Sequence, residues 1–165
     1  KEGLNFFSLL LEDCPFSMDQ SLISLTFDRI KWLIPFYMQL IIEELTNMCR
    51  DENISVVQEP VIEQAFLNLL ERRNAFEHWH TRLRSSLTTT EYNFTKELLN
   101  ILSEKGSINT KEIVDSAVKY SLESGYKELV NALVYDGYMN NQENPHMYHY
   151  NSPLLQLWWK QNVAY

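Results

Sequence analysis

The sequence predicts a mostly α-helical protein. Three observations favour this fold class: the 165 residues contain only four glycines and five prolines, 45% of them are hydrophobic, and the apolar residues recur at intervals of three or four. Few helix breakers and a period near 3.6 are typical of amphipathic helices that pack together. The hydrophobic share of 45% and the charged share of 22% indicate an ordinary globular chain.

The first third of the chain reads as three successive helices. Residues 5–11 look like the end of a helix that Pro15 terminates. Ser17 and Gln20 are spaced as a capping box for the next helix, with the Ser17 side chain as the cap. Pro35 is expected in the first turn of a third, long helix, where its missing N–H costs nothing. The apolar stripe of that helix is formed by Leu40, Ile41, Leu45 and Met48.

Two more helices complete the first half. Residues 51–53 interrupt the apolar pattern, and Pro60 opens a helix with Phe66 and Leu69 on its apolar face. A break near Asn74 precedes a further helix that ends near Leu87. We therefore expect residues 1–87 to form one helical domain, followed at residues 88–90 by a polar seam of three threonines that could act as a hinge.

The second half, residues 88–165, has a different pattern. A helix over 91–104 is expected to end at Gly106, and a short extended piece at 107–108 leads to a helix capped by Asn109 or Thr110. The inward face of the following helix is expected to hold Leu129, Val130, Leu133 and Val134.

Two strands follow in the prediction. Residues 138–139 and 147–150 read as strands around a loop of turn-forming residues. The resulting order of helix, strand, helix, helix, strand, loop and strand is that of a winged helix, a helix-turn-helix with a β-hairpin.

The last predicted helix begins at Pro153, with Ser152 as its cap. Leu154, Leu155, Trp158 and Trp159 are spaced to form one broad apolar face. Two adjacent tryptophans are costly to leave in water. We therefore expect this helix to pack on the first helix of the winged-helix domain or on the preceding helical domain.

Three segments together resemble the C-terminal region of AAA+ ATPases of the bacterial and archaeal "ATP-binding protein" type. They are DGYMNN and YHYNSPLLQLWW within residues 136–159, IKWLIPFYMQLIIEEL at 30–45 and FEHWHTRL at 76–83. The resemblance implies a lid-like helical domain followed by a winged helix. It also implies that this chain is the C-terminal part of a longer protein, an expectation that the missing initiator Met at Lys1 also favours.

The sequence has no GxxxxGK[ST] loop to cradle a triphosphate. We therefore expect the chain to be non-catalytic and to hold no cofactor itself, with ATP and Mg²⁺ bound by the ATPase core of the intact protein. In the family the lid proline lies over the adenine. The resemblance assigns that place to Pro35, with Ile34 and Tyr37 beside it. The family's glycine is replaced here by Trp32 or Leu33, and Pro35 in a purely structural role remains the alternative.

A second candidate surface lies on the predicted winged helix. Its third helix and wing should expose Ser124, Lys127, Asn131, Asn140, Asn141 and His146. In a DNA-binding winged helix these positions would face the duplex. However, the formal net charge is −8, no arginine follows Arg84, and the wing carries Glu143 but no lysine or arginine. Nucleic acid is therefore disfavoured but possible, and a protein partner or the protein's own ATPase core is preferred.

Other patterns point to no further site. His78 and His80 lie two apart on a helix and cannot share a metal ion, and His146 and His149 should face opposite sides of a strand. The charge runs at 43–44, 51–52 and 72–73 are expected to be solvated. Arg82 and Arg84 are candidates either for pairing with carboxylates of the second domain or for reaching toward the ATPase core. The apolar runs are too short to span a membrane. Two distant cysteines fit reduced thiols and a cytoplasmic location.

The sequence therefore supports three hypotheses. The preferred one is a regulatory fragment that couples the nucleotide state of an ATPase to a winged helix, which docks a protein partner or the ATPase core. The alternatives are a winged-helix DNA-binding regulator and a plain structural scaffold.

Overall fold

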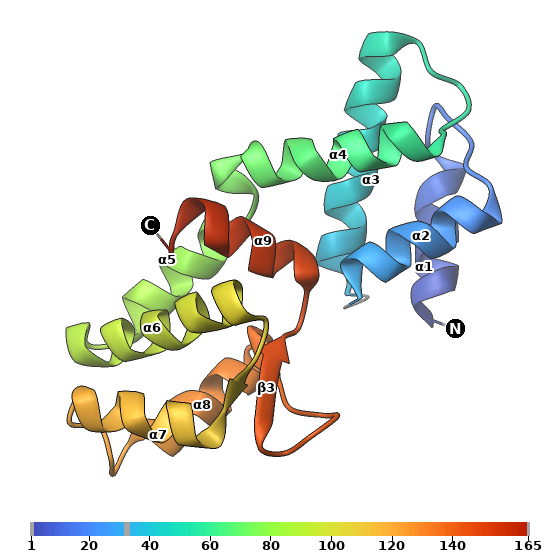
Figure 1. Ribbon diagram of the computed structural model, residues 1–165. Coiled ribbons are helices and arrows are strands. Elements are labelled where there is room, and N and C mark those ends of the chain that lie inside the picture. Colours follow the sequence, from blue (N-terminus) through green and yellow to red (C-terminus); the bar gives the residue numbers. More distant parts are fainter. Residues whose placement is uncertain (1, 32–33, 165) are drawn as a thin grey trace. The chain divides into compact units, whose positions relative to one another are not determined.

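The computed structural model describes residues 2–31 and 34–164 and confirms the mostly helical class (Figure 1). The chain forms two compact units, Lys1–Ala75 and Phe76–Tyr165. The division lies ahead of the polar seam at 88–90, because the helix that precedes this seam packs with the second unit. Trp32 and Leu33, at the position of the family's glycine, lie outside the described residues.

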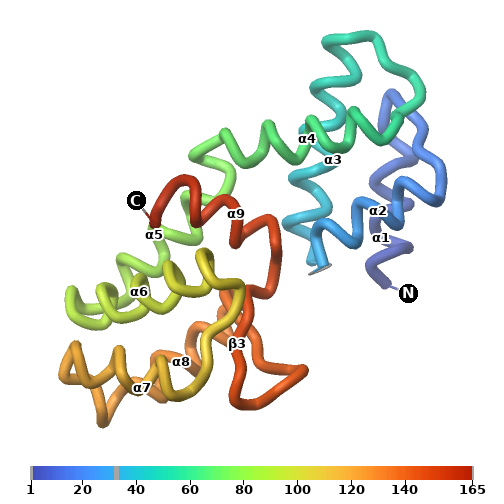
Figure 2. Tube along the Cα trace, in the orientation of Figure 1, coloured from blue at the N-terminus to red at the C-terminus, as the bar shows by residue number. Residues whose placement is uncertain are grey.

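Within its described residues the first unit has four helices: α1 (Glu2–Glu12), α2 (Gln20–Ile30), α3 (Pro35–Glu52) and α4 (Glu59–Glu71) (Figure 2). Helix α3 packs against α1 and α4, and α2 packs against α4 (Figure 1). The fully buried side chains of this unit include Phe7, Ile30, Tyr37, Met38, Ile41, Leu45 and Ile62. As expected, Pro35 occupies the first turn of α3, and Asn53 ends that helix in the left-handed conformation at φ 56°.

The predicted cap of α2 is wrong. Asp19 caps this helix, because its carboxylate accepts a hydrogen bond from the Leu22 N–H at 3.0 Å. Ser17 lies two residues too early, and its backbone pairs with a different segment. The Ser17 N–H donates to the Ser55 carbonyl, and the Val57 N–H donates to the Ser17 carbonyl, both at 2.9 Å. The extended bridge that results holds Ser17 away from the helix axis.

The expectation that Glu44 is solvated is also wrong. Its side chain is only 3% exposed and forms an ion pair at 2.8 Å with Arg72, which is half-exposed. The Asn68 side-chain amide donates to the other carboxylate oxygen, also at 2.8 Å. Glu44 lies on the face of α3 that meets α4, and a buried carboxylate is tolerated there because both oxygens have partners.

The described part of the second unit contains five helices and three short strands. After a 3-10 turn at Arg73–Ala75, the helices are α5 (Glu77–Ser86), α6 (Thr89–Lys105), α7 (Thr110–Lys119), α8 (Tyr126–Tyr135) and α9 (Pro153–Asn162). The strands are β1 (Ile108–Asn109), β2 (Met139–Asn140) and β3 (Met147–Tyr150). They form an antiparallel sheet in the order β1-β3-β2, so β3 is central.

Local signals fix the ends of α6 and α7. Thr88 and Glu91 form a capping box at the start of α6, and Asn109 and Glu112 form a second one at the start of α7. Gly106 ends α6 with φ 80°, a left-handed conformation that favours glycine. The sequence left Asn109 and Thr110 open as caps of α7, and the structure shows that Asn109 is the cap.

Helix α9 buries the terminal tryptophans, as expected. Trp158 and Trp159 are both 0% exposed, and α9 packs against α6. The Trp159 indole N–H donates to the Asn100 side chain of α6 at 2.9 Å. The predicted cap is wrong in one respect. Ser152 stands at the cap position, but its side chain makes no capping hydrogen bond and is instead fully buried.

Helix α5 belongs to this same core. Phe76 lies 5.6 Å from Trp158 between ring centroids, and Trp79 meets Tyr138 edge-on at 5.1 Å. The Tyr138 hydroxyl donates to the Trp79 carbonyl at 2.7 Å, and burial raises the pKa of this hydroxyl. Arg82 pairs with Asp136 at 2.8 Å, which agrees with its predicted pairing to a carboxylate of the second domain. These contacts explain why the second unit begins at Phe76.

Candidate docking groove

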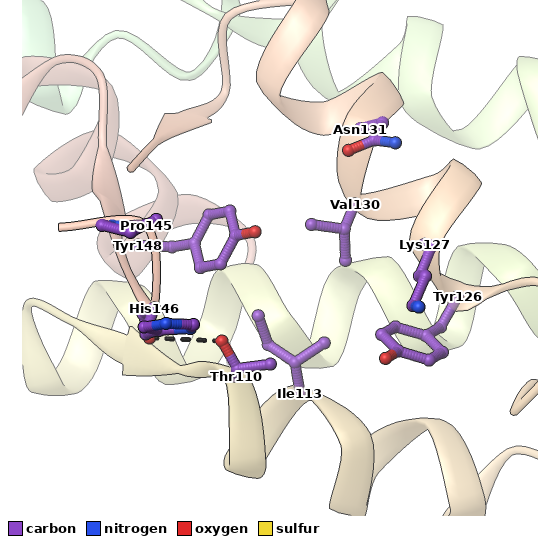
Figure 3. A pocket seen from close by; sticks show the side chains of 9 residues that line it. All are labelled: Thr110, Ile113, Tyr126, Lys127, Val130, Asn131, Pro145, His146 and Tyr148. Carbon is purple, nitrogen blue, oxygen red and sulfur yellow. Dashed lines mark hydrogen bonds between the residues drawn. The ribbon is translucent and has the colours of Figure 1, made fainter. Parts of the chain in front are cut away.

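A groove of about 250 Å³ opens between α7, α8 and the hairpin of the second unit (Figure 3). It is lined by Thr110, Ile113, Tyr126, Lys127, Val130, Asn131, Pro145, His146 and Tyr148. Three of the six side chains predicted as a partner surface, Lys127, Asn131 and His146, therefore lie around one hollow.

The helical repeat of α8 forms one wall. Tyr126 and Val130 are four residues apart, as are Lys127 and Asn131, so all four lie on neighbouring positions of one helix face. Behind this face Leu129 and Leu133 are buried and anchor α8 to the core. The wall is consequently apolar at Val130 and polar at Lys127 and Asn131.

Strand β3 and the hairpin loop form the opposite wall. The Tyr148 ring projects from β3 toward Val130, and Ile113 reaches into the space from α7 (Figure 3). The backbone carbonyl of His146 accepts hydrogen bonds from Thr110, from its N–H at 3.1 Å and its hydroxyl at 3.4 Å. These bonds tie the base of the hairpin loop to the start of α7 and hold the two sides of the groove at a fixed separation.

Lys127 is the one lysine, arginine or carboxylate residue among the described residues that line the groove. No aspartate or glutamate lines it, and Lys127 makes no ion pair within the described part of the chain. By contrast, Lys105, Lys119 and Lys160 of the same unit each pair with a glutamate. The exposed Lys127 ammonium therefore remains available to an external anionic group.

The other three predicted surface residues lie outside the groove. Ser124 is exposed in the turn before α8. Asn140 is half-buried and donates to the Asn151 side chain at 2.7 Å, and Asn141 donates to the Pro145 carbonyl at 3.3 Å. The two asparagines thus shape the hairpin.

Sequence reasoning missed Tyr126, Tyr148 and Thr110. Tyr126 could have been predicted from the sequence, because it lies four residues before Val130 and therefore on the same face of the helix. Thr110 and Tyr148 join the site only through the pairing of β1 with β3, which places Ile108 opposite Tyr148. No local signal in the sequence reports that register.

The residues assigned to the lid do not share an exposed face in the first unit. Pro35 is exposed and Ile34 is half-buried, whereas Tyr37 is 0% exposed. Of the three, Pro35 is the one whose side chain is open to solvent.

The histidines serve separate local contacts. His80 shares a hydrogen bond with the Tyr92 hydroxyl at 2.7 Å, and the His149 Nδ1 lies 3.0 Å from the Gly106 carbonyl oxygen. Burial lowers the pKa of His78. Among the described residues no three side chains of histidine, cysteine, aspartate or glutamate gather as metal ligands. Likewise, none of the described helices has the length and apolar character needed to cross a bilayer.

No protein-family model matches this chain, and comparisons with curated proteins and with solved structures find no significant similarity. The groove and its chemistry therefore supply the evidence about function.

Proposed function

We propose that this chain is a non-catalytic docking module whose second unit is a winged helix that binds a protein. The order of helices and strands over residues 89–150 supports this assignment, with α8 as the third helix and the β2–β3 hairpin as the wing. The partner-facing surface consists of the groove together with the exposed face of α8.

The distribution of charge on this surface is the observation that favours a protein partner over DNA. Lys127 is the only basic residue of α8, and the next residue is the exposed Glu128. The hairpin loop carries Glu143 and neither lysine nor arginine. A surface that contacts a duplex needs several cations against phosphates. This surface offers one lysine and a hollow of mixed apolar, aromatic and polar side chains, a composition better suited to a peptide or protein.

An exposed aromatic residue extends this surface. Tyr135 lies at the end of α8, one helical turn beyond Asn131, and is 91% exposed. Tyrosines are enriched among the residues that dominate binding energy at protein interfaces. Lys127, Asn131 and Tyr135 form a stripe at intervals of four residues that continues from the groove along α8.

The resemblance to AAA+ ATPases extends the proposal to the intact protein. There the first unit would act as a lid that senses the nucleotide, and the second would present the docking surface to a partner or to the ATPase core. ATP and Mg²⁺ would be held by that core, because this sequence has no phosphate-binding loop. Pro35 is the lid residue best exposed for contact with a base, while the buried Tyr37 fits a structural role.

Site-specific photo-crosslinking tests the docking surface. A benzophenone amino acid at Tyr135 should give a discrete protein adduct in cells of the source organism, and K127E should diminish it. The matched control is Val118 of α7, which is 54% exposed and does not line the groove. Equal adducts at both positions would contradict the proposal.

The DNA alternative is tested by fluorescence anisotropy with a labelled duplex at about 50 mM salt. Salt-sensitive binding that K127E abolishes would favour the DNA-binding regulator, whereas the docking proposal predicts no binding. The ATPase part has its own test, since it requires a GxxxxGK[ST] loop upstream of Lys1 in the same reading frame.

A further inference from the structure

We propose that the groove binds an acidic peptide segment, with one apolar side chain in the hollow and a carboxylate on Lys127. This inference rests on the proposed docking function and assigns its ligand class. The nearest competing occupants are a small-molecule ligand and a basic segment, and the groove disfavours both.

The size of the groove favours one or two side chains over a complete small molecule. Its volume of about 250 Å³ is below the range of roughly 300–1,000 Å³ that is usual for small-molecule sites. The hollow is open at the surface, between an exposed helix face and a hairpin (Figure 3). A peptide that lies across it can insert a side chain while its backbone stays outside.

The walls favour an apolar or aromatic insertion. Tyr126 and Tyr148, both half-buried, supply ring surface, and Val130 and Ile113, which are 4% and 1% exposed, add a small aliphatic surface (Figure 3). Aromatic side chains bind rings and branched aliphatic groups edge-on or face-on, with a gain beyond simple area burial. The same walls carry the amide of Asn131, which can donate and accept hydrogen bonds to a peptide backbone.

The charge at the rim selects an acidic segment. Lys127 is exposed and makes no ion pair in the described chain, and no carboxylate lines the groove to attract a basic ligand. Lys111, exposed beside Thr110, adds a second cation near the start of α7. Glu123, in the turn before α8, and Glu128 and Glu143 are also exposed, but none of the three lines the groove. Complementary charge is thus confined to Lys127 within the groove, which suits one carboxylate of a peptide and not a polyanion.

A peptide library tests the assignment. The full chain is immobilised and panned against a phage-displayed library of random 12-residue peptides. The selected peptides should combine aspartate or glutamate with an aromatic or aliphatic residue. The best one is then synthesised with a fluorescent label, and its dissociation constant is measured by fluorescence polarisation for three proteins: wild type, K127E and K96E. Lys96 is the matched control, because it makes no ion pair in the described chain and does not line the groove.

K127E should weaken binding about tenfold or more, because it places like charges together, while K96E should change it less than about threefold. Circular dichroism confirms that the variants fold, and K127A should give a smaller loss of the same sign. Selection of basic peptides, selection of none, or equal affinity for K127E and wild type would overturn the assignment. If the Tyr135 crosslinks persist in that case, the docking function stands and only the ligand class is wrong.

Discussion

Truncation of Trp158 to alanine is expected to destabilise the second unit severely. The Trp158 side chain is 0% exposed, with the Phe76 ring 5.6 Å away. A tryptophan buries about 150–250 Å². At about 25 cal/mol per Å² this corresponds to about 4–6 kcal/mol for the whole side chain. Alanine keeps a small part of that burial, so we expect a loss of about 3–5 kcal/mol in the free energy of unfolding.

Urea unfolding followed by circular dichroism measures this loss without relying on tryptophan fluorescence. Leu157 provides a matched control on the same helix, because it is 49% exposed. Leu157→Ala should cost less than about 1 kcal/mol. If Trp158→Ala is too unstable to fold, Trp158→Phe keeps a ring and should show a smaller loss of the same sign. A loss below about 1 kcal/mol for Trp158→Ala would refute the reasoning that this indole anchors α9 to the core.

Three further substitutions test separate features. Gly106→Ala should cost about 1–2 kcal/mol because φ is 80°, whereas Gly125→Ala, at the N-cap of α8 with φ −117° and equally free space, should cost at most about 0.5 kcal/mol in the same urea assay. Partial burial raises the pKa of Glu97, but hydrogen bonds from three side chains outweigh it and lower the pKa overall. The stability that Glu97 contributes should therefore be present at neutral pH and lost as pH falls through the lowered pKa of the folded state, and E97Q should reduce this acid sensitivity in urea titrations. Arg72→Ala leaves the buried carboxylate of Glu44 with one partner and should cost about 1–3 kcal/mol of first-unit stability.

Each of these three predictions would be contradicted by a specific result. Equal stability of the two glycine variants would show that the positive φ at Gly106 carries no strain. An unchanged pH profile for E97Q would mean that Glu97 titrates alike in the folded and unfolded chains. A neutral Arg72→Ala would show that solvent or Asn68 suffices for Glu44.

Local signals in the sequence were enough to predict most helix ends. Proline in the first turn of α3 and Gly106 as a stop each act within one turn of helix, so the residue type alone reports the geometry. The cap of α7 was narrowed to Asn109 or Thr110, and the structure selects Asn109. The hairpin was predicted for the same reason, since a run of turn formers separates two short strands.

The sequence-based predictions that were wrong concern residues whose structure depends on contacts between distant segments. Ser17 has the spacing of a cap, but a backbone bridge to residues 55–57 places it outside α2. Glu44 was predicted to be a solvated surface charge, but the packing of α4 on α3 places Asn68 and Arg72 in contact with its carboxylate. The groove likewise depends on β3 lying between β1 and β2, a pairing that joins residues nearly forty positions apart.

The central position of β3 also bears on how the protein is made. Its two neighbours in the sheet come earlier in the chain, and α6 finds its main packing partner in α9, the last helix. During translation the first unit can fold as soon as it leaves the ribosome, whereas the second must wait until Pro153–Asn162 has emerged. Over that interval the nascent chain exposes the apolar faces of α5 and α6, so this is the stage at which a chaperone is most needed.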